Sequence, residues 1–184
     1  GRGVEKNPTE GIPWLKLGAE KFEDPEAQSK LGFAYANGEG NLQKDLAEAY
    51  RWWRKSADQG YWGAQYPLGW TLMRGDAYIK QDKSEGLKML KSSASQGYSV
   101  SQQSLAIIYR EGELVEKDLA ESFKWSLMAA NDGNKDGMYG VGHSYYFGNG
   151  VKKDLEKAFE WLVQGAALDG GDSQGLLGFM YWRG

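Results

Sequence analysis

The residues that most resemble catalytic machinery are a histidine and its neighbours. His143 is the sole histidine of the 184 residues, Ser144 follows it directly, and Asp136 precedes it by seven positions. A catalytic triad needs nucleophile, base and orienting acid to converge in space, and neighbours at i and i+1 on a helix point in different directions. The chain also has no cysteine, which excludes thiol catalysis, disulfides and zinc–thiolate sites. We therefore predict no catalytic residue and interpret His143 as a side chain that lines a binding groove.

Residues 132–137 read Asp-Gly-Asn-Lys-Asp-Gly, which matches the opening of a calcium-binding loop. Such a loop needs a bidentate glutamate at its twelfth position, where this chain has His143. The glycines at 38–40 and 148–150 lack the Gly-Lys-Ser/Thr tail of a phosphate-binding loop. We therefore expect turns at these segments, with no metal and no cofactor.

Composition narrows the class of partner. The formal net charge is −3, with lysine and arginine spread along the chain, so no basic stripe indicates a nucleic-acid partner. No apolar stretch is long enough to span a membrane, and no signal peptide is visible at the polar start of the sequence. The 41% hydrophobic content supports a buried core. Glycine, with 26 positions, is about twice as frequent as usual and needs a positional explanation.

An internal period supplies that explanation. A Leu-Gly-like pair recurs at steps of 37, 37, 36 and 36 residues, a glycine follows each pair by six residues, and four of the five are then followed by an aspartate. Self-similarity at a fixed step indicates a solenoid of helical repeats. The pairs are Leu31-Gly32, Leu68-Gly69, Leu105-Ala106, Val141-Gly142 and Leu177-Gly178.

Each period predicts two helices. In the first complete period, a helix from about Ala27 to Asn37 ends at Gly38, and Asp45 is the N-cap of a second helix that Gly60 ends. Apolar and small side chains recur at helical spacing in both segments, which indicates one buried stripe on each helix. The buried residues expected on the second helix are Ala49, Tyr50, Trp53 and Ala57.

The pattern Ala-Gln-x-x-Leu-Gly-x-x-Tyr-x-x-Gly-x-Gly, followed by Asp, Ala, Trp, Ala and Gly, resembles the Sel1-like repeat, most closely in residues 140–171. The resemblance covers residues 12–184 and weakens in the second and third periods, where Leu72 and Met89 replace aromatics and Gly86 replaces an alanine. It implies an all-α, right-handed superhelical solenoid related to tetratricopeptide arrays. It also implies a bacterial scaffold or adaptor, periplasmic or secreted, with roles at envelope or host interfaces.

We expect a single repeat domain that begins and ends with a partial repeat. We also expect the chain to be a piece of a longer array, with apolar ends that can associate end to end. The expected segments are a second helix at 12–26, complete repeats at 27–63, 64–100, 101–136 and 137–172, and the first helix of a fifth repeat at 173–184.

In the tetratricopeptide-like geometry that the resemblance implies, the first helix of each repeat lines a concave groove. The side chains predicted there are rich in aromatic residues and arginine, the types enriched at interface hot spots. We therefore predict that the groove binds a protein or peptide partner. The predicted contact residues are Phe33, Tyr66, Trp70, Met73, Arg74, Ile107, Arg110, Tyr139, His143, Tyr146, Phe147, Phe179 and Trp182.

Two other functions compete with this prediction. A glycan could stack on Trp70, Tyr139 or Tyr146 in the same groove. A glycan hydrolase ranks third, because it would need a carboxylate pair at glycosidase spacing and the groove positions offer only Glu111. Arg74 and Arg110 favour the protein partner, since guanidinium groups pair well with carboxylates.

Overall fold

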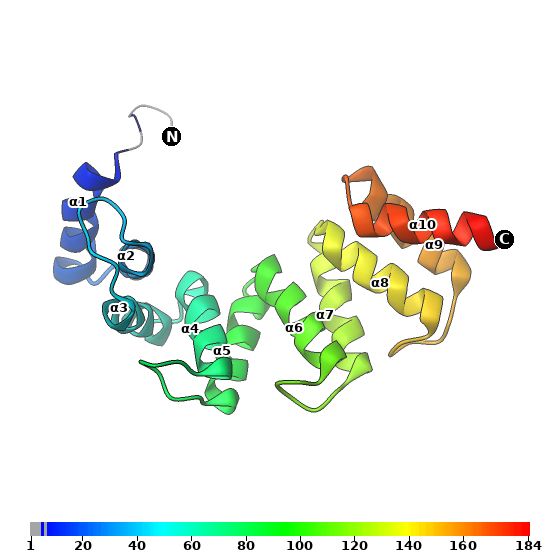
Figure 1. Cartoon of the computed structure of the whole chain (residues 1–184), viewed down its shortest axis with the longest axis horizontal. Coiled ribbons are helices and arrows are strands. Elements are labelled where there is room, and N and C mark those ends of the chain that lie inside the picture. The colour runs from blue at the N-terminus through cyan, green and yellow to red at the C-terminus, as the bar shows by residue number, and fades with distance from the viewer. Residues whose placement is uncertain (1–4, 6) are drawn as a thin grey trace. The chain divides into compact units, whose positions relative to one another are not determined.

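The computed structural model describes residue 5 and residues 7–184, which form ten α-helices and no strand (Figure 1). This confirms the predicted all-α repeat architecture. The chain divides into a first compact unit that ends at Gln96 and a second, Gly97–Gly184. The first unit holds α1 (Pro8–Lys21), α2 (Pro25–Asn37), α3 (Leu46–Asp58), α4 (Trp62–Arg74) and α5 (Lys83–Ser95). The second holds α6 (Ser99–Glu111), α7 (Leu119–Asn131), α8 (Lys135–Phe147), α9 (Leu155–Ala167) and α10 (Gly171–Arg183).

Aspartates start the second helix of each pair, as predicted. The Oδ1 atom of Asp45 accepts a hydrogen bond from the backbone N–H of Glu48 at 3.0 Å, and Asp82, Asp118 and Asp154 cap α5, α7 and α9 in the same way. Such caps satisfy donors that the first helical turn leaves unpaired. The same device extends α1, which begins at Pro8 rather than near residue 12, because Asn7 Oδ1 accepts from the N–H of Glu10 at 3.3 Å.

The Leu-Gly pairs hold the two helices of a pair together. Leu31 and Val141 are fully buried, and the glycine that follows each of them admits a large side chain from the second helix. A methyl group at Gly32 would lie 2.5 Å from Trp53 Cδ1, and one at Gly142 would lie 2.6 Å from Leu162 Cγ. The glycines are therefore needed for the close approach of the helices.

The pair α6–α7 departs from this arrangement, because it has a small residue at both positions. Ala106 of α6 stands where the other pairs have glycine, and α7 has Ser126 where α3 has Trp53 and α9 has Leu162. The Ser122 hydroxyl donates to the Ala106 carbonyl oxygen at 2.7 Å and holds the two helices together. This pair therefore closes with less side-chain volume between its helices.

The first unit compensates for a loop that lacks the Gly-x-Gly sequence. Between α4 and α5, the Asp76 carboxylate accepts from the backbone N–H of Tyr78 at 2.8 Å and from that of Ile79 at 2.9 Å. The hydroxyl of Tyr50 on α3 donates to Asp76, and burial together with this hydrogen bond raises the pKa of Tyr50 to about 12. The loop is thus tied to α3 by side chains.

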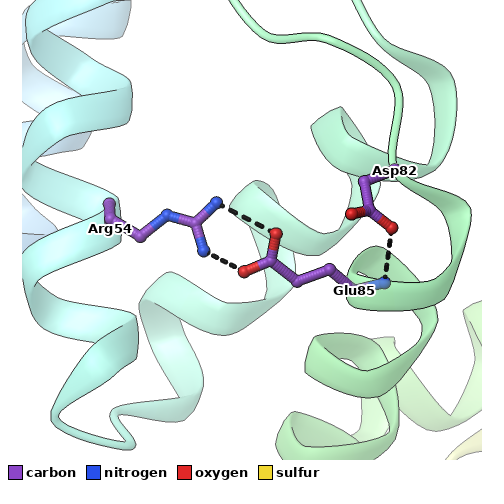
Figure 2. Close-up of polar contacts among 3 residues, drawn as sticks. All are labelled: Arg54, Asp82 and Glu85. Atoms are coloured by element: carbon purple, nitrogen blue, oxygen red, sulfur yellow. Dashed lines mark hydrogen bonds and ion pairs between the residues drawn. The ribbon is translucent and has the colours of Figure 1, made fainter.

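A second tie joins α3 to α5. The guanidinium of Arg54 on α3 donates to both carboxylate oxygens of Glu85, with 3.4 Å between Arg54 Nη2 and Glu85 Oε2 (Figure 2). The backbone N–H of Glu85 in turn donates to Asp82 Oδ1 at 2.9 Å, so the cap of α5 lies beside the ion pair (Figure 2). Both partners are half-buried, which places this bridge among the stronger surface pairs.

Candidate functional site

The predicted contact residues are divided between the two units. Phe33, Tyr66, Trp70, Met73 and Arg74 lie on α2 and α4 of the first unit. The remaining eight lie on the first helices of the pairs in the second unit, and they are Ile107, Arg110, Tyr139, His143, Tyr146, Phe147, Phe179 and Trp182.

The assignment of Met73 as a contact residue is corrected by its burial. Its exposed fraction is 0%, so a partner cannot touch it. The reason lies on α5, where Gly86 replaces the usual alanine: a methyl group at Gly86 would come within 2.9 Å of Met73 Cγ. The missing methyl group admits the Met73 side chain into the interior.

Two aromatic side chains of the first unit already have roles within it. The ring of Phe33 meets that of Trp53 edge to face, with centroids 5.1 Å apart. The guanidinium of Arg74 lies 4.7 Å from the centroid of the Trp70 ring. Each contact joins two side chains of the first unit to each other.

The second unit brings six of its predicted residues into one continuous cluster. Along α8, the ring of His143 lies 5.7 Å from that of Tyr139 and 4.6 Å from that of Phe147. Phe147 lies 4.8 Å from Tyr146, whose ring reaches across to Phe179 on α10 at 6.2 Å. Phe179 then lies 6.3 Å from Trp182. We call this cluster the aromatic row, and its members are Tyr139, His143, Tyr146, Phe147, Phe179 and Trp182.

Three members of the aromatic row (Phe147, Phe179 and Trp182) are exposed, the other three are half-buried, and cations lie at the edge of the row. Trp182 is 79% exposed and Phe147 is 53% exposed. The Arg183 guanidinium lies 4.9 Å from the Phe179 centroid, and Lys153 Nζ lies 5.7 Å from the Tyr146 centroid. Apolar rings with cations at their edges are typical of protein interfaces.

His143 is an uncharged member of this row at neutral pH. Burial, and then the positive charge of Arg110, lower the pKa of His143 below its ordinary value. No hydrogen bond within the second unit joins His143 to Ser144, and the Asp136 carboxylate instead accepts from Gln103 Nε2 at 2.8 Å. The geometry of a catalytic triad is therefore missing around His143.

A cavity of about 250 Å³ opens beside the row, between α6, α7, α8 and α10. Tyr139 belongs to both the row and the cavity wall, so the two features form one surface. The predicted residues Ile107 and Arg110 line the cavity as well. Its other lining residues are Gln103, Ala106, Ser126, Asp136, Gly137, Gly140 and Asp172.

Four of the lining residues, Ser126, Asp136, Gly140 and Asp172, were not predicted as contact residues. The repeat contains a signal for Ser126, which is the one small residue at a repeat position that Trp53, Leu90 and Leu162 occupy in the other second helices. The equivalent positions of the second helices therefore carry the sequence signal for the cavity.

The segment that resembles a calcium loop uses its oxygens for the turn between α7 and α8. Asn134 Oδ1 accepts from the backbone N–H groups of Asp136 and Gly137, each at 2.9 Å, and Asp132 Oδ2 accepts from Gln102 Nε2 at 2.8 Å. Within the described part of the chain, no group of three His, Cys, Asp or Glu side chains is placed to hold a metal ion. No helix among the described residues is both long and apolar enough to cross a membrane.

Comparison with known proteins identifies the family. The family model described as Sel1 repeat matches residues 1–21, 25–61, 62–98, 99–134 and 135–170. No curated protein matches the sequence. Sel1 repeat proteins are generally scaffolds for protein interactions and are typically non-catalytic.

Solved bacterial structures agree with this match. The protective antigen c5321 of uropathogenic Escherichia coli, which displays an SLR fold, is 37% identical with a TM-score of 0.86, and the match covers 94% of this chain but only 36% of the antigen. A Sel1 repeat protein from Oxalobacter formigenes is 30% identical with a TM-score of 0.87, over 97% of this chain and 72% of that protein. Cysteine rich protein B of Helicobacter pylori shares the fold at 22% identity and a TM-score of 0.55, over 74% of this chain and 98% of that protein. This chain belongs to the Sel1 repeat family.

Proposed function

We propose that the chain is a non-catalytic scaffold that binds a protein or peptide partner on the aromatic row of its second unit. The observation that carries the proposal is the continuity of the row. Six rings follow one another in contact along α8 and across to α10, and they end at the highly exposed Trp182. Contiguous exposed apolar surface on a protein of this size usually marks an interaction site.

The row lies outside the buried cluster that packs α8 against α7. The core of α8 is made by Met138 and Val141, and Tyr145 turns its ring toward Phe123 of α7, with centroids 5.3 Å apart. Tyr146, its neighbour in sequence, instead meets the rings of Phe147 and Phe179. Because the core is filled without the row, a role in binding explains the row better than a role in folding.

The geometry of the row favours a protein over a glycan. Adjacent rings are inclined to each other by 41° to 79°, so the row offers facets rather than a run of coplanar faces on which sugar rings could stack. Facets of this kind suit the irregular side chains of a polypeptide. The cations at the edge, Arg183 and Lys153, supply partners for acidic groups of the bound protein.

The resemblance to a protective antigen of uropathogenic E. coli supports an envelope or host interface as the setting. Fractionation of the native bacterium, with antibody labelling of intact and permeabilised cells, tests this part of the proposal. Signal confined to the cytosolic fraction would refute it.

The test of binding compares two neighbours on α10. Tyr181 is 75% exposed, almost as much as Trp182, but its ring meets Phe159 of α9 and takes no part in the row. The immobilised chain and its Trp182→Ala, Tyr146→Ala and Tyr181→Ala variants are incubated with extract of the native host and, in parallel, on a glycan array. Bound proteins are identified by mass spectrometry, and affinities are then measured by calorimetry with the purified partner.

We expect Trp182→Ala and Tyr146→Ala each to weaken the affinity at least tenfold, since truncated aromatic hot spots cost about 2 kcal/mol or more. Tyr181→Ala should bind as the unmodified chain does. Equal losses for all three variants would refute the proposal, and specific retention on glycans with no protein bound would favour the glycan alternative.

A further inference from the structure

We propose that the cavity beside the aromatic row binds one basic side chain, a lysine or an arginine, of the partner. The inference rests on the proposed function, because the row would hold the rest of the same polypeptide. To the proposed function it adds the chemical class of the partner side chain that enters the cavity.

The size of the cavity suits a single side chain. Small-molecule sites usually enclose roughly 300–1,000 Å³, and this cavity measures about 250 Å³. It opens on the surface that carries Tyr139, at the end of the aromatic row. A residue of a bound peptide can therefore enter it while its neighbours lie along the row.

The cavity is specific to the pair α6–α7. In the other helix pairs, a large side chain (Trp53, Leu90 or Leu162) fills the corresponding place. Here Ser126 is buried but too short to do so, and Gly140 on α8 adds no side chain from the opposite wall.

The charge of the lining favours a cation. Asp136 and Asp172 come from the first turns of α8 and α10, where helix N-termini stabilise negative side chains. Gln103 donates to the Asp136 carboxylate, and the ion pairs of the second unit (Arg110–Glu111, Lys124–Glu121 and Lys157–Asp154) include neither aspartate. Lys135, the lysine next to Asp136 in sequence, directs its Nζ to the backbone carbonyl of Asp169 at 3.3 Å.

Arg110, the one positively charged residue that lines the cavity, does not outweigh the two aspartates. Arg110 Nη2 lies 3.2 Å from Glu111 Oε1, so its charge is partly compensated by a neighbour. An acidic side chain in the cavity would meet two aspartates and one compensated arginine. An apolar side chain would desolvate both aspartates without pairing them, which costs free energy.

The remaining walls fit the stem of a basic side chain. Ile107 and Ala106 offer apolar surface to a chain of methylene groups, as long cationic side chains commonly require. Tyr139 lines the cavity as well, and an aromatic ring attracts a cation that lies over its face. A lysine or arginine therefore finds carboxylates, an aromatic ring and an apolar wall in one cavity.

The test titrates the 184-residue protein with N-acetyl-lysinamide and N-acetyl-argininamide and follows backbone amide signals by NMR. N-acetyl-norleucinamide, which has an apolar stem without the charge, and the amide of N-acetylglutamate are the matched probes. We expect saturable shifts at Ile107 and Gly140 with the basic probes only. Saturable shifts with the norleucine or glutamate probe of the same size, or none with the basic probes, would overturn the inference.

Variants then locate the binding. Asp172→Asn keeps the shape of the side chain and should weaken the basic probes roughly tenfold, because hydrogen bonds to charged groups contribute about that much. Asp169→Asn, three residues away and outside the cavity wall, should leave probe binding unchanged. The reverse ranking of these two variants would refute the site.

The fate of the two proposals can be separated with Tyr146→Ala. This variant changes the row but not the cavity wall, so it should lose the protein partner and still bind the basic probes. If Tyr146→Ala loses the partner while the basic probes never bind, the proposed function stands and the inference about the cavity fails.

Discussion

Replacing Gly150 with alanine should destabilise the second unit through a single methyl group. Gly150 lies in the loop between α8 and α9 and has φ +73°, the left-handed region that favours glycine. An added methyl group would overlap the carbonyl of Leu119 and lie 2.8 Å from the backbone N of Ala120, at the start of α7. The loop would therefore have to move away from α7.

The expected magnitude has two parts. An alanine in the left-handed region costs about 1–2 kcal/mol relative to glycine. Displacing a packed loop costs about 1–3 kcal/mol more, as overpacking of a close contact does. The sum, about 2–5 kcal/mol, corresponds to a Tm lower by roughly 10 °C for a chain of this length.

Gly133 is the matched control for this experiment. It has φ +81°, but a methyl group there would meet no atom within 4 Å. Gly133→Ala should show only the conformational cost, about 1–2 kcal/mol. Thermal and urea unfolding followed by far-ultraviolet circular dichroism measure both variants. Equal losses at the two positions would refute the reasoning, because the contact with α7 would then contribute nothing.

Three further predictions concern other parts of the chain. Burial and the charge of Arg110 lower the pKa of His143 in the folded state, so the stability that neutral His143 provides is full above the ordinary histidine pKa of about 6.5 and is lost as the pH falls below it. His143→Phe should therefore reduce the drop in Tm between about pH 7.5 and about pH 5, and an unchanged drop would contradict this. A double-mutant cycle on Arg54 and Glu85 should give a coupling of about 0.5–1 kcal/mol that weakens in salt, whereas zero coupling at low salt would show that the bridge does not stabilise the first unit. Sedimentation velocity should show association of the 184-residue chain that rises with concentration and falls in Trp14→Ser, since Trp14 is 74% exposed on α1; a monomer at all concentrations would exclude end-to-end contact.

The fold follows closely from local sequence signals. Asp45 and Gly38 mark the start of α3 and the end of α2 because a cap and a left-handed terminus depend on one residue and its immediate backbone. The same kind of signal at Asn7-Pro8 explains why α1 begins earlier than the apolar pattern indicates.

The candidate site follows less completely, because it depends on pairs of residues from different helices. The members of the aromatic row could be predicted from the period, since His143 and Phe179 occupy one repeat position, Tyr146 and Trp182 another, and Tyr139 and Phe147 lie on the same helix as His143. Met73 occupies the same repeat position as Tyr146 and Trp182, but it is buried because Gly86 on the next helix leaves space for its side chain. The cavity likewise depends on Ala106 and Ser126 together. The residues at one repeat position do not show which side chains the facing helix contributes.

The cavity should also lower the free energy of unfolding of the second unit, and replacing two residues should restore it. The pairs α4–α5 and α8–α9 combine a glycine with a leucine (Gly69 with Leu90, Gly142 with Leu162), whereas α6–α7 combines Ala106 with Ser126. The double variant Ala106→Gly/Ser126→Leu reproduces the common combination.

Gly140 lies close against Ser126, since a methyl group there would be 2.7 Å from Ser126 Oγ, so the new leucine has to extend toward the space that Ala106→Gly opens. Burying that leucine should stabilise the second unit by about 1–3 kcal/mol, measured by urea unfolding, while it removes the space that the basic probes need. A gain in stability together with lost probe binding is the pattern expected when a binding site is kept at the expense of packing. If the double variant is less stable than the natural pair, Ser126 is required for the packing of α7 itself, and the cavity is not spare volume.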